Sequence, residues 1–260
     1  MSLGDLERYF GLLALGLARC LPLVWLLPAF GGPTVSRQLR LGFGGALSGL
    51  CLPILAAQMP VGGGFAGSLL VAREVLVGVV MGFVCACWFR AAEAAGSVVD
   101  VLCGFDFVAA GPSEKDGRRG PFAGVMLLFA IVVFLEIGGI GHVTLALARS
   151  YDAIPVAGSL SVTSAAHAAA AAVLVASAKL IEAALGLCAP VLVALVLADL
   201  VLGVIGRAIQ QLPIHVLGNP LKTLLGIGVL LLGLGGIRAA LQGSLADFVA
   251  LMGWPIGPRP

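Results

Sequence analysis

Seven apolar segments, each close to the length of a membrane-spanning helix, dominate this sequence. They lie at about residues 10–30, 41–59, 68–89, 121–141, 168–187, 189–206 and 213–236. A helix needs ~20 mainly apolar residues to cross the hydrocarbon core of a bilayer. Charged residues make up only 11% of the chain and the mean hydropathy is +1.11, so a polar surface adequate for a water-soluble domain is excluded. The sequence therefore predicts an all-α membrane protein.

Segments 168–187 and 189–206 adjoin each other, so they form either two helices or one long helix. A single helix over both would be about 57 Å long at 1.5 Å per residue, well beyond a hydrocarbon core of ~30 Å. We therefore expect a break near Pro190 or a tall, kinked helix. The chain as a whole is expected to form roughly six to seven hydrophobic helices, with bends and helical hairpins.

The chain is expected to form one domain over residues 1–260. Its predicted parts are helical regions at about 10–103 and 121–236, a connecting loop at 104–120 and a carboxyl-terminal tail at 237–260. The amino-terminal apolar segment is expected to be a retained span, because the charges before it are mixed in sign and no A-x-A cleavage site follows it.

Basic residues are distributed unevenly among the loops. Loop 31–40 carries Arg37 and Arg40, and loop 112–120 carries Lys115 and two arginines. Alternation of the spans puts these two loops on the same side of the membrane. Because cytoplasmic loops are enriched in Lys and Arg, we expect both loops to be cytoplasmic and the amino terminus to lie outside.

Several charged residues lie within the apolar tracts. Eight of the 28 do so: Arg19, Arg73, Glu74, Glu136, Lys179, Glu182, Asp199 and Lys222. On insertion scales each costs about 2.5 to 3.5 kcal/mol at the centre of a membrane helix, so full exposure to lipid would cost on the order of 20 kcal/mol. These side chains are therefore expected to form ion pairs within the chain, to face a wet cavity, or to contact other subunits.

Helical spacing places some of these charges on the same face as glycines. Glu74, Gly78 and Gly82 follow one another at i, i+4 and i+8, so a carboxylate shares its face with two gaps that admit a neighbouring backbone. The same arrangement recurs in Asp199, Gly203 and Arg207. Such faces fit close partners, which are either helices of this chain or helices of another subunit.

Signatures of enzymes and cofactor sites are absent from the sequence. It contains no G-x-S-x-G, H-E-x-x-H or G-x-x-x-x-G-K-[ST] motif. The six cysteines, without a CxxC pair, are expected to pack as small apolar residues, and the three histidines are expected to have structural or interfacial roles. We expect no metal, no cofactor, no nucleic acid and no catalytic activity. A secondary transporter with a polar cavity at the midplane remains an alternative function, and an intramembrane hydrolase is a third.

The stretch GFDFVAAGPSEKDGRRGPF, at residues 104–122, interrupts the apolar tracts. Its glycines permit positive φ and rearrangement, whereas its prolines restrict the neighbouring backbone. Phe105, Phe107 and Val108 offer an apolar seal beside a charged tip. The pattern fits either a movable functional loop or an ordinary connection.

The order of features along the chain resembles the export apparatus family that is called SctT in type III secretion injectisomes and FliR in flagella. The resemblance covers about residues 10–235. After Arg19, Pro28, Arg37 and Arg40, its carriers are AREVLVGVVMGF at 72–83, AAGSVVDVLCGFDFVAAGP at 94–112, FLEIGGIGH at 134–142, RSYDAIP at 149–155 and ADLVLGVIGRAIQQLPIHVLGNPLK at 198–222.

The chain departs from the family pattern in two places. Gly111 stands where the family commonly has an Asp before the proline of the loop. In the family's R-x-x-P-Q-L-N-x-F motif, Arg207, Gln211 and Leu212 match, whereas the positions of its Pro, Asn and Phe hold Gln210, Pro213 and His215. Ser150 and Tyr151 before Pro155 are closer to the injectisome branch than to the flagellar one.

The resemblance implies a multi-pass protein of the bacterial inner membrane that assembles with SctR-like and SctS-like subunits into a helical export pore. It further implies contacts with an SctU-like switch protein, the SctV-like export gate, membrane lipid and secreted, unfolded polypeptides. Loop 104–121 would be the pore plug, formed by Gly104, Phe105, Asp106, Phe107, Val108, Gly111, Pro112, Gly117, Gly120 and Pro121. Assembly or intramembrane polar roles are expected for Arg73, Glu74, Gly78, Gly82, Glu136, Lys179, Glu182, Asp199, Gly203, Arg207, Gln211 and Lys222.

Overall fold

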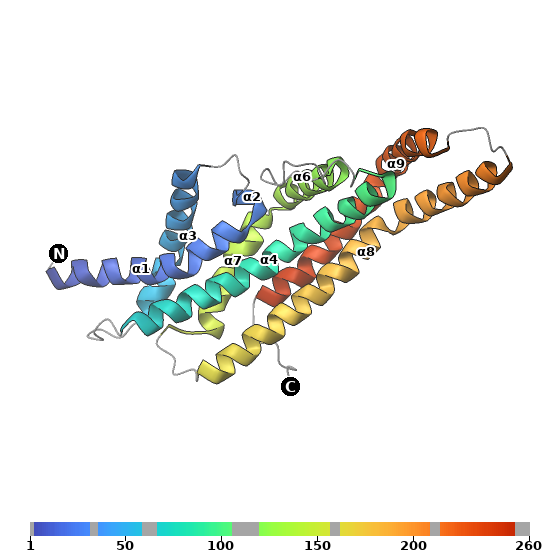
Figure 1. Ribbon diagram of the computed structural model, residues 1–260. Coiled ribbons are helices and arrows are strands. Elements are labelled where there is room, and N and C mark those ends of the chain that lie inside the picture. Colours follow the sequence, from blue (N-terminus) through green and yellow to red (C-terminus); the bar gives the residue numbers. More distant parts are fainter. Residues whose placement is uncertain are drawn as a thin grey trace. The chain divides into compact units, whose positions relative to one another are not determined.

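The structure, a computed structural model, describes residues 3–31, 36–58, 67–105, 120–156, 162–208 and 214–252. Every regular element in these residues is a helix (Figure 1). In chain order the helices are α1 (Leu3–Leu26), α2 (Pro28–Gly31), α3 (Arg37–Gln58), α4 (Gly67–Cys103), α6 (Pro121–Glu136), α7 (Gly139–Ala153), α8 (Val162–Ala208) and α9 (Ile214–Met252). The predicted all-α class is confirmed.

Four helical segments in the described residues are long and apolar enough to cross a membrane, and α6 with α7 makes a fifth if the two count as one bent span. The four are Arg37–Gln58, Leu70–Cys103, His167–Ala208 and Gly218–Met252. The seven expected segments therefore reduce to four or five spans. The first segment corresponds to a shorter apolar helix, Gly11–Leu26, and the two adjoining segments correspond to α8 alone.

Pro190 lies inside α8 and does not end it, so of the two expected arrangements the chain adopts the tall helix. The last helix continues to Met252, whereas we expected it to end near residue 236. A genuine break separates α6 from α7, because α6 ends at Glu136 and α7 begins at Gly139. Gly138, at φ +70°, precedes α7 in the left-handed region that favours glycine, so α6 stops and a new helix begins there.

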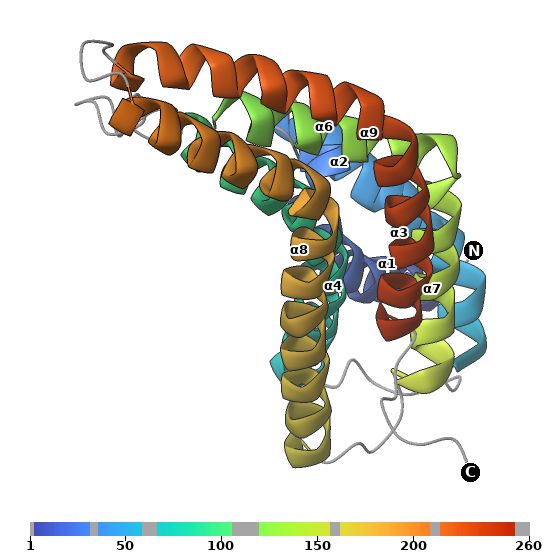
Figure 2. The same ribbon diagram turned by 90° about the vertical axis from the view of Figure 1, so that its right-hand side faces the viewer.

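The chain divides into two compact units, and each is described by itself. Unit 1 comprises Met1–Cys87, Gly138–Ala178 and Leu245–Pro260. In it α1 packs along α3, and α3 contacts α7 (Figure 2). Leu23, Leu27 and Leu55 are among its fully buried side chains. The single-domain organisation expected for residues 1–260 stays a prediction.

Unit 2 comprises Trp88–Ile137 and Lys179–Ser244. An aromatic cluster in it joins α4 to α6, because Trp88 and Phe89 lie edge to face at 4.9 Å and both approach the ring of Phe134. The indole nitrogen of Trp88 donates to the Leu241 carbonyl at 3.3 Å and to the Ser244 hydroxyl at 3.1 Å, which adds α9. Trp88 is thus buried with its one polar atom satisfied.

All six cysteines are buried and none forms a disulfide. They lie at positions 20, 51, 85, 87, 103 and 188, each within a helix. This placement is the one expected of small apolar packing residues.

Candidate functional site

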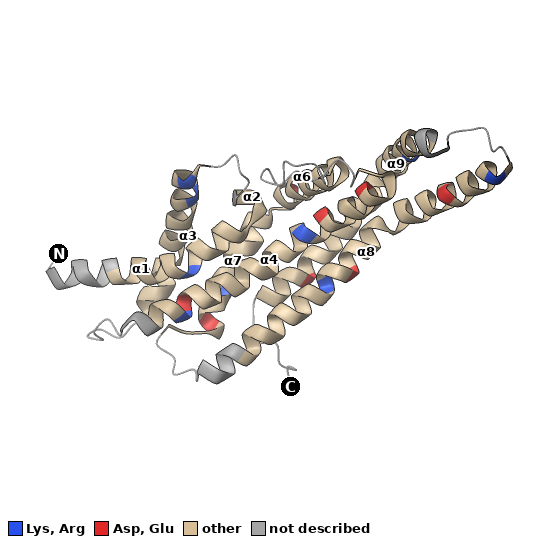
Figure 3. Cartoon of the chain, viewed as in Figure 1, with Lys and Arg blue, Asp and Glu red and all other residues tan. Residues whose placement is uncertain are grey.

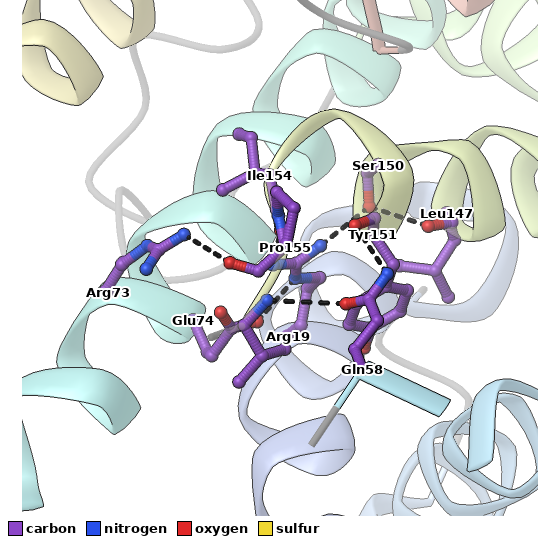
Figure 4. Close-up of polar contacts among 10 residues, drawn as sticks. Arg19, Gln58, Arg73, Glu74, Leu147, Ser150, Tyr151, Ile154 and Pro155 are labelled. Atoms are coloured by element: carbon purple, nitrogen blue, oxygen red, sulfur yellow. Dashed lines mark hydrogen bonds and ion pairs between the residues drawn. The ribbon is translucent and has the colours of Figure 1, made fainter. Parts of the chain in front are cut away.

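The Arg19 guanidinium is the centre of a buried polar cluster in unit 1 (Figure 4). Its Nε donates to Oε2 of Glu74 at 2.6 Å, Nη1 donates to the Ser150 hydroxyl at 3.0 Å, and Nη2 donates to the Ile154 carbonyl at 3.2 Å. The guanidinium carbon also lies 4.0 Å from the centre of the Tyr151 ring. A cation within an apolar tract, for which the sequence indicated no partner, is therefore paired inside the chain.

Two further side chains complete this cluster at the end of α7. Gln58 of α3 donates to the Tyr151 carbonyl at 2.9 Å and accepts from the Val156 amide at 3.4 Å. Arg73 of α4 donates to the Pro155 carbonyl at 2.8 Å. Side chains of α1, α3 and α4 thereby bind backbone groups that the last turn of α7 and the segment after it leave open. We call Arg19, Gln58, Arg73, Glu74, Ser150 and Tyr151 the Arg19 cluster.

The glycine face of α4 is occupied by α1 of the same chain. A Cβ placed on Gly78 would lie 2.9 Å from the carbonyl carbon of Arg19 and closer still to its oxygen. A Cβ on Gly82 would lie 2.9 Å from the Cα of Leu23. The close partner expected for Glu74, Gly78 and Gly82 is thus the chain's own first helix. An effect of this face on assembly stays a prediction.

Unit 2 contains two ion pairs that join elements far apart in the sequence. Lys222 of α9 pairs with Asp199 of α8, and Arg238 of α9 pairs with Glu136 at the end of α6. The side chains of Glu136 and Arg238 are about half exposed. Three of these four charged residues, Glu136, Asp199 and Lys222, were singled out in the sequence. The fourth, Arg238, was not, because it lies beyond the predicted last span.

The remaining expected assembly residues lie along α8, apart from Gln211, which is outside the described residues. Lys179 is half-buried, whereas Glu182, Gly203 and Arg207 are exposed. Figure 3 marks the basic positions along α8 in blue and the acidic positions in red. A Cβ on Gly203 would meet nothing within 4 Å in the described part of the chain. This stretch of α8 differs from the glycine face of α4, because its gap is open.

The carboxyl-terminal end of α4 forms a hydrogen-bonded turn. The Gly104 amide donates to the Val101 carbonyl at 3.0 Å, and the Phe105 amide donates to the Asp100 carbonyl at 3.0 Å. Gly104 has φ +80°, so the pair of bonds is a Schellman motif with glycine at the left-handed position. The expected start of the loop at residue 104 is therefore where the helix ends.

The other end of the loop is held by a side chain that sequence reasoning missed. Asp100 accepts from the Phe122 amide at 3.0 Å through Oδ1 and from the Ala123 amide at 2.9 Å through Oδ2, and it is only 4% exposed. Gly120, the N-cap of α6, has no side chain with which to cap the helix. The sequence signal for such a residue was the helix start Gly-Pro-Phe. None of these side chains can accept a hydrogen bond from the first backbone amides of the helix, so an acceptor from another element is expected.

Four of the expected plug residues are described, and they lie at the two ends of the loop. Phe105 approaches Phe122 with ring centres 6.1 Å apart, Gly104 faces the Asn219 amide of α9, and Gly120 and Pro121 start α6. The other six are outside the described residues: Asp106, Phe107, Val108, Gly111, Pro112 and Gly117.

Comparison with known proteins identifies the family. Residues 10–248 match the family described as bacterial export proteins, family 1. The secretion system apparatus protein SsaT of Salmonella typhimurium is 29% identical over 232 residues, which cover 85% of each chain. Two flagellar biosynthetic proteins FliR are similar: that of Caulobacter vibrioides is 25% identical over 86% of this chain and 88% of its own, and that of Escherichia coli is 26% identical over 89% and 84%. This match agrees with the motifs that carry the resemblance and with the four to five candidate spans of the described residues. The chain therefore belongs to family 1 of the bacterial export proteins, the multi-pass membrane proteins of the FliR and SctT type.

Proposed function

We propose that this chain is a structural and gating subunit of a type III protein export pore in the bacterial inner membrane. Its family membership over residues 10–248 favours export of polypeptides over the alternative of small-solute transport. The relatives that it resembles are named for flagellar biosynthesis and for a secretion system apparatus. Its proposed partners are SctR-like and SctS-like pore subunits, an SctU-like switch protein, the SctV-like export gate and the exported polypeptides.

The observation that carries the assembly part of this proposal is the exposed surface of α8. Only 17% of the residues in an apolar 18-residue stretch of α8 are buried within the chain. Along the whole of α8, the exposed residues include large apolar side chains such as Leu174 and Leu200. They also include the charged side chains of Glu182 and Arg207. A charged side chain is costly in lipid and is normally sheltered by protein or water. This surface therefore fits contact with neighbouring subunits.

The gating part of the proposal concerns loop 104–121. Phe105 and a glycine turn lie where it leaves α4, Phe105 approaches Phe122 of α6, and a buried carboxylate caps the start of α6. Fixed ends of this kind support a loop that acts from a defined position in a pore. An ordinary connection between two helices needs no buried carboxylate to link its ends.

Removal of residues 106–119 tests the gating role. The shortened chain is co-expressed with its partner subunits, and ion conductance is measured across membranes that contain the assembled complex. We expect the deletion to raise the leak. A second variant, in which the same residues are replaced by an equally long Gly/Ser linker, keeps the span of the loop and is expected to leak as well. Unchanged conductance in both variants would remove the gating role and leave the structural one.

A further inference from the structure

Asp100 links both ends of loop 104–120 within unit 2. Its backbone carbonyl accepts the Phe105 amide that closes the turn after α4, and its carboxylate accepts the Phe122 and Ala123 amides at the start of α6. We call the residues at this junction the loop neck: Gly96, Asp100, Gly104, Phe105, Gly120, Phe122, Ala123 and Asn219. Asp100 thus joins α4 to α6 at the place where the loop between them begins and ends.

The electrostatics of the neck depend on this carboxylate. Both of its oxygens receive a backbone N–H at the first turn of α6, where the helix dipole favours a negative charge. Phe122 and Ala123 are themselves buried, at 7% and 2% exposure. Water is therefore poorly placed to replace the carboxylate, and its removal leaves two buried donors without an acceptor.

The geometry of the neck allows little alternative packing. A Cβ on Gly96 would lie 2.6 Å from the Cα of Ala123, so the backbones of α4 and α6 are in direct contact there. A Cβ on Gly120 would lie 2.8 Å from Oδ1 of Asp100 and closer to its other carboxylate atoms. At the other end, a Cβ on Gly104 would lie 2.7 Å from the side-chain nitrogen of Asn219. Three glycines thus provide the space that the backbone of α6 and the side chains of Asp100 and Asn219 occupy at the junction.

We propose that Asp100 is a positioning residue of the export pore, whose carboxylate fixes the points at which loop 104–120 leaves α4 and enters α6. The proposal rests on the proposed plug function of that loop. A capping residue within α6 itself would stabilise the helix equally well. The capping group instead belongs to α4, so the same two hydrogen bonds that complete α6 also tie it to the other end of the loop.

The two effects of Asp100, capping α6 and linking it to α4, are separable by mutation. Asp100→Ala removes both. In that background Gly120→Asp restores a cap from the N-cap position, because the collision with Asp100 is gone and Gly120 has φ −58° and ψ 156°, which suit an N-cap residue of any type. The double variant Asp100→Ala/Gly120→Asp therefore caps α6 without linking it to α4. Glu93→Ala, which removes another carboxylate from α4, is the matched control.

The variants are compared in the complete complex, co-expressed with the partner subunits, by ion conductance and by hydrogen exchange of the peptide that starts α6. For Asp100→Ala we expect a raised leak and exchange at residues 122 and 123 faster by at least about tenfold, since each hydrogen bond to a charged group corresponds to that factor or more. The double variant is expected to recover slow exchange but still to leak, and Glu93→Ala is expected to do neither.

Three results would overturn the proposal. They are a sealed pore in assembled Asp100→Ala, a sealed pore in the double variant, and failure of both variants to assemble, which would make Asp100 a folding residue. These results are distinct from failure of the plug itself: if deletion of residues 106–119 leaks while Asp100→Ala stays sealed, the plug stands and only the role of Asp100 is wrong.

Discussion

Buried charge is the feature that most needs explanation at the scale of single residues. Arg19 and Glu74 are both 0% exposed and form an ion pair with each other. Such a pair contributes little net stability when compared with apolar residues, but loss of one partner leaves an uncompensated charge. The pairing itself was beyond prediction, because residues 19 and 74 are related only by the contact of α1 with α4. The sequence indicated the need for a partner and not its identity.

Arg19→Met is expected to destabilise the isolated subunit strongly, by about 3 to 5 kcal/mol, because it leaves the Glu74 carboxylate buried and unpaired. Thermal unfolding of the purified subunit in detergent measures the effect. The double variant Arg19→Met/Glu74→Leu removes both charges and is expected to regain most of the loss. If Arg19→Met alone unfolds at the parental temperature, the buried pair is not a determinant of stability.

Gly78→Leu is expected to destabilise the subunit before any partner is present, because its side chain would overlap the backbone of Arg19. Gly186→Leu on α8 is the matched control, since a Cβ there meets no atom within 4 Å among the described residues. Size-exclusion chromatography of the subunit expressed alone separates the two. A well-folded Gly78→Leu subunit that fails only to bind its partners would return this face to the interface between subunits.

At the scale of elements, the sequence predicted the ends of the loop after residue 103 better than the number of spans. The loop after residue 103 begins and stops where glycine and proline indicated, since those residues act locally through φ and missing N–H groups. The count of spans failed at Pro190, because α8 continues through this proline, which membrane helices tolerate through small local adjustments. At about 70 Å for its 47 residues, α8 exceeds the hydrocarbon core by far. Part of it therefore lies outside lipid or against protein.

The ion pair of Lys222 with Asp199 is expected to hold α9 against α8. Asp199→Lys places two cations together and is expected to lower the melting temperature of the subunit, with Lys222→Asp in the same chain restoring it. The Asp199 side chain is 42% exposed, so we expect a change of no more than about 1 kcal/mol. Equal melting temperatures for the single and the double charge reversal would show that the pair contributes nothing.

At the scale of the whole molecule, the apolar surface of α8 and α9 exceeds what the chain itself covers. The most apolar windows of the two helices are 17% and 22% buried. Composition predicted a membrane protein, and the order of motifs predicted its family. Both predictions were possible because each sums contributions from many residues along the sequence and does not depend on which residues are in contact. Which exposed face meets lipid and which meets protein depends on other chains, so it lay beyond what this sequence alone determines.

Glu182→Leu is expected to leave the isolated subunit as stable as before but to lower the yield of the complex with SctR-like and SctS-like partners, because it removes an exposed charge from a proposed interface. Mild-detergent co-purification followed by mass measurement of the intact complex provides the readout. Glu182→Gln keeps the size of the side chain and isolates the effect of charge. Undiminished yield with both variants would place Glu182 outside the interface.

The burial of all six cysteines has a practical consequence. Because the native thiols are buried in helix contacts, bulky water-soluble alkylating dyes react with them poorly. A single cysteine introduced at a chosen exposed position is therefore labelled with little background from the native cysteines. Membrane sidedness, including the expected external amino terminus, can therefore be mapped in the natural chain without first engineering a cysteine-free version.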